Sequence, residues 1–200
     1  MNDRVQIIDE KLLSDNWYVL KKFTFQYQHK NGTASTQHRE AYDRGNGATI
    51  LLHNPDTDTV ILTRQFRLPT FVNGNPTGML IETCAGLLDN DDPQTAIIRE
   101  TEEETGFKLT AVRKVMEAYM SPGSVTERLF FYLAEYGQHT ERTPGGGVDE
   151  EDIEVLELPL NQALGMIETG EIMDGKTIML LYYLKLHPWL SAMKIGHLAI

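Results

Sequence analysis

The chain has 200 residues, which predicts one ordinary domain or one domain with a small appendage. Hydrophobic residues make up 41% of it and charged residues 24%, so the chain can bury a core and is not compositionally disordered. Its 18 basic and 29 acidic residues give a formal net charge of −11, which argues against a general nucleic-acid binder, because such proteins neutralise phosphates with basic side chains.

The same sequence excludes several locations and site types. No apolar run approaches the roughly 18–20 residues that a membrane span needs, and residues 1–6 lack the basic and apolar stretches of a secretory signal. Cys84 is the only cysteine, which excludes an intramolecular disulfide and a multi-cysteine metal site. We therefore expect a cytoplasmic protein that binds neither nucleic acid nor membranes.

Residues 1–44 predict a small antiparallel β unit. Residues 17–20 and 23–27 are expected to form strands because they are rich in aromatic and β-branched side chains. The polar residues 34–42 are expected to form the returning strand. Asn31 and Gly32 are a hairpin-turn signal. We assign residues 45–200 to a second domain.

That second domain alternates strand-like and helix-like segments. The expected strands are residues 48–52, 59–63, 111–119, 128–136 and 153–158, with a turn at residues 54–58. The expected helices are residues 93–105, 160–168 and 176–186, the last closed by Pro188. Because the two kinds of segment are interleaved, we predict an α/β (α+β) fold, a sandwich built on a mixed sheet.

The expected helix at residues 93–105 has clear ends. Asp92 can accept hydrogen bonds from the first free amides, and Pro93 presets the backbone of the first turn. Gly106 suits a left-handed cap at the other end. The residues expected to pack on the sheet are Ile98, Thr101 and Thr105.

Successive residues of an α-helix are about 100° apart, so residues three or four positions apart lie on the same face. Three carboxylates with that spacing lie on the other face of this helix. Glu100, Glu103 and Glu104 repel one another, and Arg99 can relieve only part of the repulsion by pairing with Glu103. A hard divalent cation would remove the conflict, and Mg²⁺ prefers oxygen ligands while leaving positions open for substrate phosphates. The alternative is a solvated acidic face with no ligand.

The sequence around these glutamates resembles the signature of the Nudix hydrolases. In that signature Arg-Glu-apolar-any-Glu-Glu-any-Gly-apolar follows a glycine and a glutamate. The matching residues, with Gly86 as the leading glycine, are Arg99, Glu100, Glu103, Glu104, Gly106 and Phe107. Thr101 is only weakly apolar, and Glu102 is unusual for this helix. The span from Gly86 to Arg99 is one residue short, and Asp91 or Asp92 stands where the family has glutamate. The resemblance implies an α/β/α sandwich with a mixed sheet, preceded here by the small N-terminal β unit.

Further segments resemble the ADP-ribose and nucleoside-diphosphate-sugar branch of that family, and the resemblance extends to about residue 187. They are residues 64–67, 121–123 and 153–155. The implied reaction is metal-dependent hydrolysis of a nucleoside diphosphate sugar, with GDP-mannose giving GMP and mannose 1-phosphate. The alternatives are ADP-ribose as substrate, or a catalytically silent nucleotide sensor. Sensors typically lose the signature glutamates that this chain keeps.

The resemblance also implies a metal site. Its expected ligands are the main-chain carbonyl of Ala85 and the carboxylates of Glu100, Glu104 and Glu151, with Mg²⁺ as the ion and Mn²⁺ as the alternative. Glu100, Glu104 and Glu151 are the expected catalytic residues. Glu103 is either a further ligand or the partner of Arg99. Glu151, the candidate base, and Glu150 follow three glycines at residues 145–147, which suit a closing loop, although a solvated turn is the alternative.

Substrate contacts follow by position in the same resemblance. They are Trp17, His38, Arg39, Glu40, Arg67, Ala85, Gly86, Leu87, Glu104, Glu127, Glu150, Glu151 and Lys176. Arg39 and Arg67 suit phosphate oxygens but could be structural ion pairs instead. Trp17 either stacks on guanine or belongs to the core, and Lys176 either reaches the substrate or is a surface lysine. The β unit is implied to exchange between two subunits, so a homodimer is expected.

Overall fold

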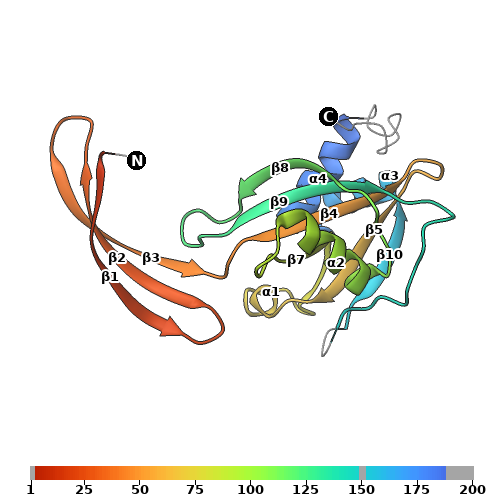
Figure 1. Ribbon diagram of the computed structural model, residues 1–200, viewed down its shortest axis with the longest axis horizontal. Coiled ribbons are helices and arrows are strands. Elements are labelled where there is room, and N and C mark those ends of the chain that lie inside the picture. The colour runs from red at the N-terminus through yellow and green to blue at the C-terminus, as the bar shows by residue number, and fades with distance from the viewer. Residues whose placement is uncertain (1–2, 149–151, 188–200) are drawn as a thin grey trace. The chain divides into compact units, whose positions relative to one another are not determined.

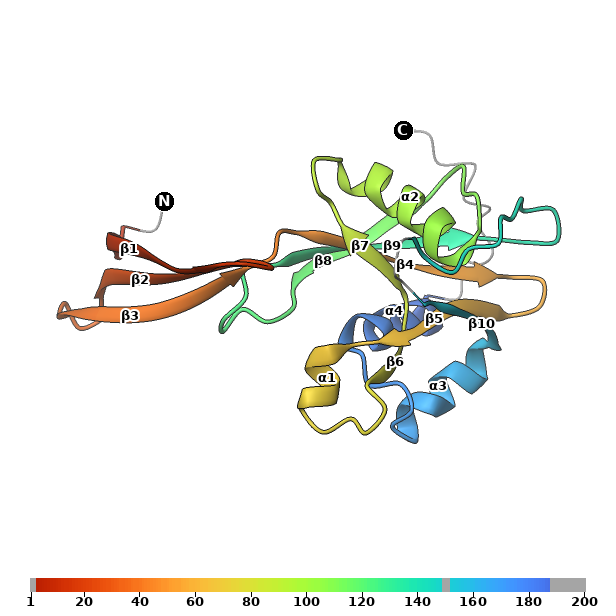
Figure 2. The ribbon, with the colours of Figure 1, turned by 90° about the horizontal axis from the view of Figure 1, so that it is seen from below.

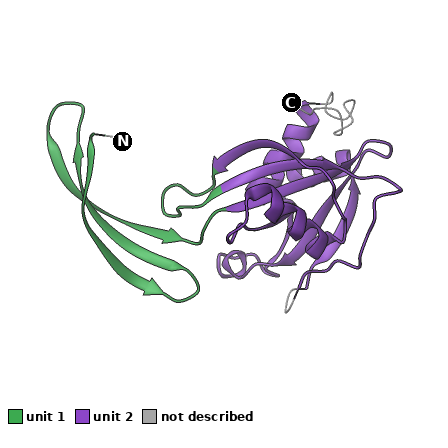
Figure 3. Ribbon diagram, in the orientation of Figure 1, with its two compact units in different colours: residues 1–46, 119–128 green, residues 47–118, 129–200 purple. Residues whose placement is uncertain are grey.

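The computed structural model describes residues 3–148 and 152–187. Contacts between residues divide the chain into two compact units, residues 1–46 with 119–128 and residues 47–118 with 129–200 (Figure 3). In the part of the chain that the structure describes, no helix combines the length and the apolar composition of a membrane span.

The first unit is built on a three-stranded antiparallel sheet in the order β1-β2-β3 (Figure 1). Its strands are β1 (Val5–Asp15), β2 (Val19–Gln28) and β3 (Ala34–Asp43). The predicted turn is confirmed, since Gly32 has a φ of 84° between β2 and β3. Strand β1 was not predicted as a separate element because it is exposed along nearly its whole length and so carries no period-two pattern of apolar residues.

The second unit contains a seven-stranded sheet. Its strands are β4 (Gly47–Asn54), β5 (Thr59–Phe66), β6 (Met79–Glu82), β7 (Cys84–Leu87), β8 (Arg113–Tyr119), β9 (Arg128–Glu135) and β10 (Glu154–Pro159). The order is β10-β5-β4-β9-β8, with β6 on β5 and β7 on β4. Strand β4 runs parallel to β9 and antiparallel to β5 and β7, which confirms the mixed sheet.

Helices cover both faces of this sheet. They are α1 (Leu68–Val72), α2 (Pro93–Thr105), α3 (Leu160–Glu168) and α4 (Gly175–Leu186). Figure 2 shows α2 on one face and α3 and α4 on the other, the predicted sandwich. The bounds predicted for α2 and α3 are confirmed, and α4 begins one residue early. The short elements α1, β6 and β7 were not predicted, because four or five residues carry too little pattern. Pro188 lies outside the described residues.

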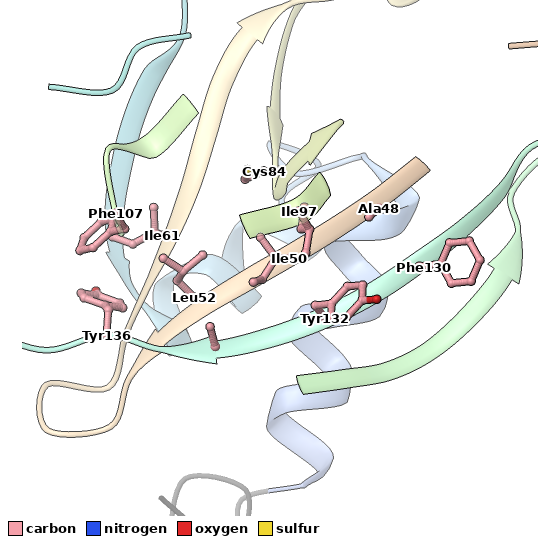
Figure 4. Close-up of a cluster of buried hydrophobic side chains, with 11 residues drawn as sticks. Ala48, Ile50, Leu52, Ile61, Cys84, Ile97, Phe107, Phe130, Tyr132 and Tyr136 are labelled. Atoms are coloured by element: carbon pink, nitrogen blue, oxygen red, sulfur yellow. The ribbon is translucent and has the colours of Figure 1, made fainter. Parts of the chain in front are cut away.

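The core between the sheet and α2 is apolar and centred on β4, all of whose residues are buried (Figure 4). Its buried members are Ala48, Ile50, Leu52, Ile61, Cys84, Ile97, Phe107, Phe130, Tyr132, Ala134 and Tyr136. The prediction for Ile98 was wrong, since Ile97 is fully buried and Ile98 only partly. Ile97 aligns with the buried Thr101 and Thr105 at four-residue spacing, whereas Ile98 is turned about 100° away.

Both predicted ends of α2 are confirmed. The Asp92 carboxylate accepts hydrogen bonds from the amides of Gln94 (3.0 Å) and Thr95 (3.2 Å). Gly106 adopts a left-handed φ of 80° at the C-terminus. A Cβ atom there would lie 2.2 Å from the carbonyl oxygen of Thr143, so this glycine is required by space as well as by backbone conformation.

We expect the substitution Gly106→Ala to lower the free energy of unfolding by about 2–4 kcal/mol, because it adds a clash with backbone to the strain of a left-handed alanine. Gly170→Ala is the matched control: Gly170 has a φ of 79° with nothing within 4 Å of its Cβ position. There only the strain remains, about 1 kcal/mol. Urea unfolding followed by circular dichroism measures both, and equal losses would contradict the packing explanation.

Candidate active site

Strand β7 and helix α2 bring the first predicted site residues together. A Cβ atom on Gly86 would lie 2.1 Å from the carboxyl carbon of Glu100 and 2.5 Å from its Oε1. The Glu100 carboxylate therefore lies directly against the main chain of β7, next to Ala85. Gly86 is required at this point because any larger residue would displace the carboxylate.

Glu104 lies one turn further along α2 and is buried, with 4% of its surface exposed. Burial raises the pKa of the Cys84 thiol well above its ordinary value, and the charges of Glu104 and Glu100 raise it further. Both carboxylates are thus close enough to act electrostatically on the Cys84 thiol, which stays protonated. Cys84 is 1% exposed and packs as a small buried hydrophobe.

Arg99 neutralises one side of the acidic face. Its Nη1 lies 2.9 Å from Glu100 Oε1 and 3.1 Å from Glu103 Oε2. Asp91 and Asp89 approach the same guanidinium group at 3.7 and 3.9 Å. The predicted pairing of Glu103 with Arg99 is therefore present, and Arg99 contacts the candidate ligand Glu100 in the same way. A further role of Glu103 as a metal ligand stays a prediction.

Arg67 and Lys176, both predicted substrate contacts, meet on a carboxylate that the sequence analysis missed. Arg67 Nη2 lies 2.7 Å from Glu82 Oε2, and Lys176 Nζ lies 3.2 Å from the same oxygen. The Glu82 side chain is only 3% exposed. Burial alone would raise the pKa of Glu82, but hydrogen bonds and charges from the two cations outweigh it and hold the pKa below its ordinary value. A glutamate ending the apolar run of β6 was the available signal, because buried carboxylates need partners.

The donors on β7 and α2 suit a hard divalent cation, since all are oxygens and one carboxylate is buried beside the main chain. Within residues 3–148 and 152–187, no group of three or more His, Cys, Asp or Glu side chains is gathered as a complete metal site. Glu150 and Glu151, the predicted loop carboxylates, lie outside the described residues. The described side chains thus offer two of the expected ligands, Glu100 and Glu104.

The three glycines before those loop residues are fixed to α2. The amide of Gly146 donates to the carbonyl oxygen of Glu104 (2.8 Å) and that of Gly147 to Glu103 (3.0 Å). A Cβ atom on Gly145 would lie 2.7 Å from the amide nitrogen of Gly106. Gly146 and Gly147 therefore complete the hydrogen bonding at the end of α2. All three glycines have a positive φ, and at Gly145 close packing against the backbone is a further reason for glycine.

Most of the remaining predicted contacts lie in the first unit. Trp17 is 83% exposed in the bend between β1 and β2, so it is not a core residue. His38 Nδ1 lies 3.0 Å from Thr24 Oγ1, and Arg39 donates to the carbonyl of His38 (2.7 Å). Glu40 is exposed on β3. Two further predicted contacts are Leu87 and Glu127. Leu87 is the last residue of β7, and the Glu127 carboxylate lies 3.6 Å from Arg44 Nε.

Comparisons with known proteins agree with this architecture. Residues 4–42 match the model of the GDP-mannose pyrophosphatase NudK N-terminal domain, and residues 43–181 match the NUDIX domain. The chain is 57% identical over 184 residues to a GDP-mannose pyrophosphatase of Citrobacter koseri, covering 92% of this chain and 96% of that one. It is 55% identical over 186 residues to a GDP-mannose pyrophosphatase of Escherichia coli O157:H7, covering 93% and 97%.

A solved structure titled as an ADP compounds hydrolase shares the fold. It superposes with a TM-score of 0.72 over 95% of this chain and 96% of that chain, at 17% sequence identity. At that identity the likeness concerns the fold alone.

Proposed function

The chain belongs to the Nudix family, and on that premise we propose that it hydrolyses the diphosphate of nucleoside diphosphate sugars, GDP-mannose first, to GMP and mannose 1-phosphate. The observation that carries this proposal is the close approach of the Glu100 carboxylate to the main chain at Gly86, one helical turn from the buried Glu104. An acidic protein needs such a site, because a diphosphate brings further negative charge to it. The names of the Citrobacter and Escherichia relatives support the choice of substrate.

Nudix hydrolases need a divalent metal ion, and we propose Mg²⁺ here, with Mn²⁺ able to replace it. Glu100, Glu104, Glu151 and the carbonyl of Ala85 would hold it. When bound, such an ion polarises the phosphoryl group and lowers the pKa of water. We place the protein in the cytoplasm, which suits its single free cysteine.

The other predicted site residues bind the substrate or assist the reaction. Arg67 and Lys176 bind the diphosphate oxygens, since a guanidinium fork and an ammonium suit phosphate. Glu151 accepts the proton of the attacking water, and Arg99 holds Glu103 beside the ligands. Contacts to the nucleotide come from the remaining predicted residues, namely Trp17, His38, Arg39, Glu40, Gly86, Leu87, Glu127 and Glu150.

Steady-state kinetics with GDP-mannose and ADP-ribose test this proposal. We expect kcat/KM to be higher for GDP-mannose, with GMP and mannose 1-phosphate as products. Faster turnover of ADP-ribose would keep the metal chemistry and replace the substrate. No turnover of either nucleotide, in a protein that still binds metal, would favour the silent sensor.

We also propose a homodimer in which residues 1–44 are exchanged between subunits. In the described residues 3–46 no side chain is fully buried, so this single-layer sheet has no core of its own. Strand β1 exposes Ile7, Ile8, Leu12 and Leu13, each at least 40% exposed. Such a surface is typical of a protein interface.

Light scattering at micromolar concentration is expected to give the mass of two chains. The double substitution Ile8→Asp and Leu12→Asp is expected to shift the mass toward one chain, because it places charge in the proposed interface. Lys30→Asp, in the hairpin turn of the same unit, is the control for added negative charge. A single-chain mass for the wild type would contradict the dimer.

A further inference from the structure

Glu82 joins three elements of the second unit at one buried carboxylate. It is the last residue of β6, Arg67 follows β5, and Lys176 lies in the first turn of α4. Arg67 donates through Nε to Glu82 Oε1 (3.0 Å) and through Nη2 to Oε2 (2.7 Å), which is a two-point contact. Lys176 donates to Oε2 from the other element (3.2 Å). Such a paired carboxylate orients its cations as well as neutralising them.

Both cations keep donors for a ligand. Glu82 takes Nε and Nη2 of Arg67, while Nη1 has no hydrogen-bond partner among the described residues, and 39% of the side chain is exposed. The Lys176 ammonium has three donors. One of them goes to Glu82, and the ammonium group also lies 3.1 Å from Asp174 Oδ2. One edge of each cation is therefore held by protein, and the other can meet an anion.

A chain of hydrogen bonds fixes α4 beside Glu82. Asp174 caps the helix by accepting from the amide of Thr177 (3.0 Å) and from its hydroxyl (2.6 Å). The Thr177 hydroxyl oxygen accepts in turn from the amide of Thr83 (2.7 Å), the residue after Glu82. Thr177 is fully buried. These contacts tie the first turn of α4, which carries Lys176, to the junction between β6 and β7.

The charge of Glu104, a proposed metal ligand, also acts on Arg67. Burial alone would lower the pKa of Arg67, but its contact with Glu82 and the charges of Glu82 and Glu104 raise it. The guanidinium group is therefore within electrostatic range of Glu104. Without Glu82, Arg67 would lose its two-point contact and Lys176 would lose its hydrogen bond to Oε2.

We propose that Glu82 is the positioning residue that aims Arg67 and Lys176 at the diphosphate oxygens. This inference rests on the proposed function, because it names what holds that substrate's charged part. Glu82 is too buried to touch the substrate itself, so it acts through the two cations.

The substitution Glu82→Gln tests the inference by keeping side-chain volume and removing charge. We expect KM for GDP-mannose to rise about tenfold or more while kcat changes less than about threefold, since ground-state binding of the diphosphate is lost. The affinity for inorganic pyrophosphate in excess Mg²⁺, measured by calorimetry, should fall by a similar factor. The control is Glu157→Gln, the same chemical change at an exposed carboxylate that accepts from the hydroxyls of Tyr136 and Thr59. It should leave KM unchanged.

A second background separates positioning from stability. In Arg67→Ala protein, Glu82→Gln should raise KM much less than in the wild type, because the side chain it positions is gone. A purely structural role would lower the melting temperature in both backgrounds and would leave KM unchanged by Glu82→Gln. If Glu82→Gln does not fold, Glu82→Asp serves, since it keeps the charge but is too short to reach both cations, and an intermediate KM is expected.

An unchanged KM and an unchanged pyrophosphate affinity in the folded variant would overturn the role of Glu82. Failure of the proposed function is distinguished by the wild type, which would then not turn over GDP-mannose at all. Pyrophosphate binding would still decide the role of Glu82 in that case.

Discussion

Glu104→Gln is expected to lower kcat on the order of 10³-fold without unfolding the protein. Glutamine keeps the shape of the side chain but supplies one weaker oxygen donor and no charge, so the cation that the site needs is bound poorly. Glu104 is buried beside Cys84, where no solvent can replace the lost carboxylate. Kinetics at saturating GDP-mannose, with circular dichroism to verify folding, measure the effect.

Glu102→Gln is the matched control for this substitution. It makes the same chemical change on the same helix, at a residue whose carboxylate lies 3.9 Å from Lys108 and away from β7. Its kcat should stay within about twofold of the wild type. We attribute the loss of activity in Glu104→Gln to the position of Glu104, not to the removal of one negative charge from α2. Wild-type turnover in Glu104→Gln would remove Glu104 from the metal site.

Gly86→Ala is expected to lower kcat/KM on the order of 10²-fold, because a displacement of about 1 Å in a reacting group has that effect. The new methyl group would lie 2.1 Å from the present position of the Glu100 carboxyl carbon, so the carboxylate would have to move. The Glu100 side chain is flexible and can swing aside, so the fold should survive while the ligand is lost. Activity assays and thermal unfolding on the same preparation separate these two effects.

Gly137→Ala provides the comparison for Gly86→Ala. Nothing lies within 4 Å of a Cβ atom at Gly137, and its φ is outside the left-handed range. This variant should match the wild type in both activity and stability. If Gly86→Ala also retained full activity, the contact between Glu100 and the main chain of β7 would have no part in catalysis.

Local features of the sequence predicted much of this fold. The caps of α2 depend on Asp92 and Gly106, which act within three or four residues of themselves, so their chemistry is visible in the sequence. The spacing of Glu100 and Glu104 likewise follows from helical geometry. Ile98 was assigned to the core in place of Ile97 because the orientation of the buried face depends on the sheet that packs against it.

Features that depend on distant partners could not be predicted. Glu82 meets Lys176 across 94 positions of sequence, and nothing local identifies either as the partner of the other. The glycines at residues 145–147 were interpreted as flexibility. Two of their amides are hydrogen-bonded to carbonyl oxygens of α2, about forty residues earlier in the chain. The exchange of residues 1–44 between subunits stays a prediction.

One measurement tests the central claim, metal-dependent cleavage of a diphosphate at the site formed by β7 and α2, most directly. Phosphorus NMR would follow GDP-mannose incubated with the purified protein in Mg²⁺, then with excess chelator, then with Mg²⁺ restored. We predict that GMP and mannose 1-phosphate form, that their formation stops on chelation, and that it resumes when metal is returned. Turnover that continues in chelator, or products that retain the diphosphate such as GDP and mannose, would contradict the account.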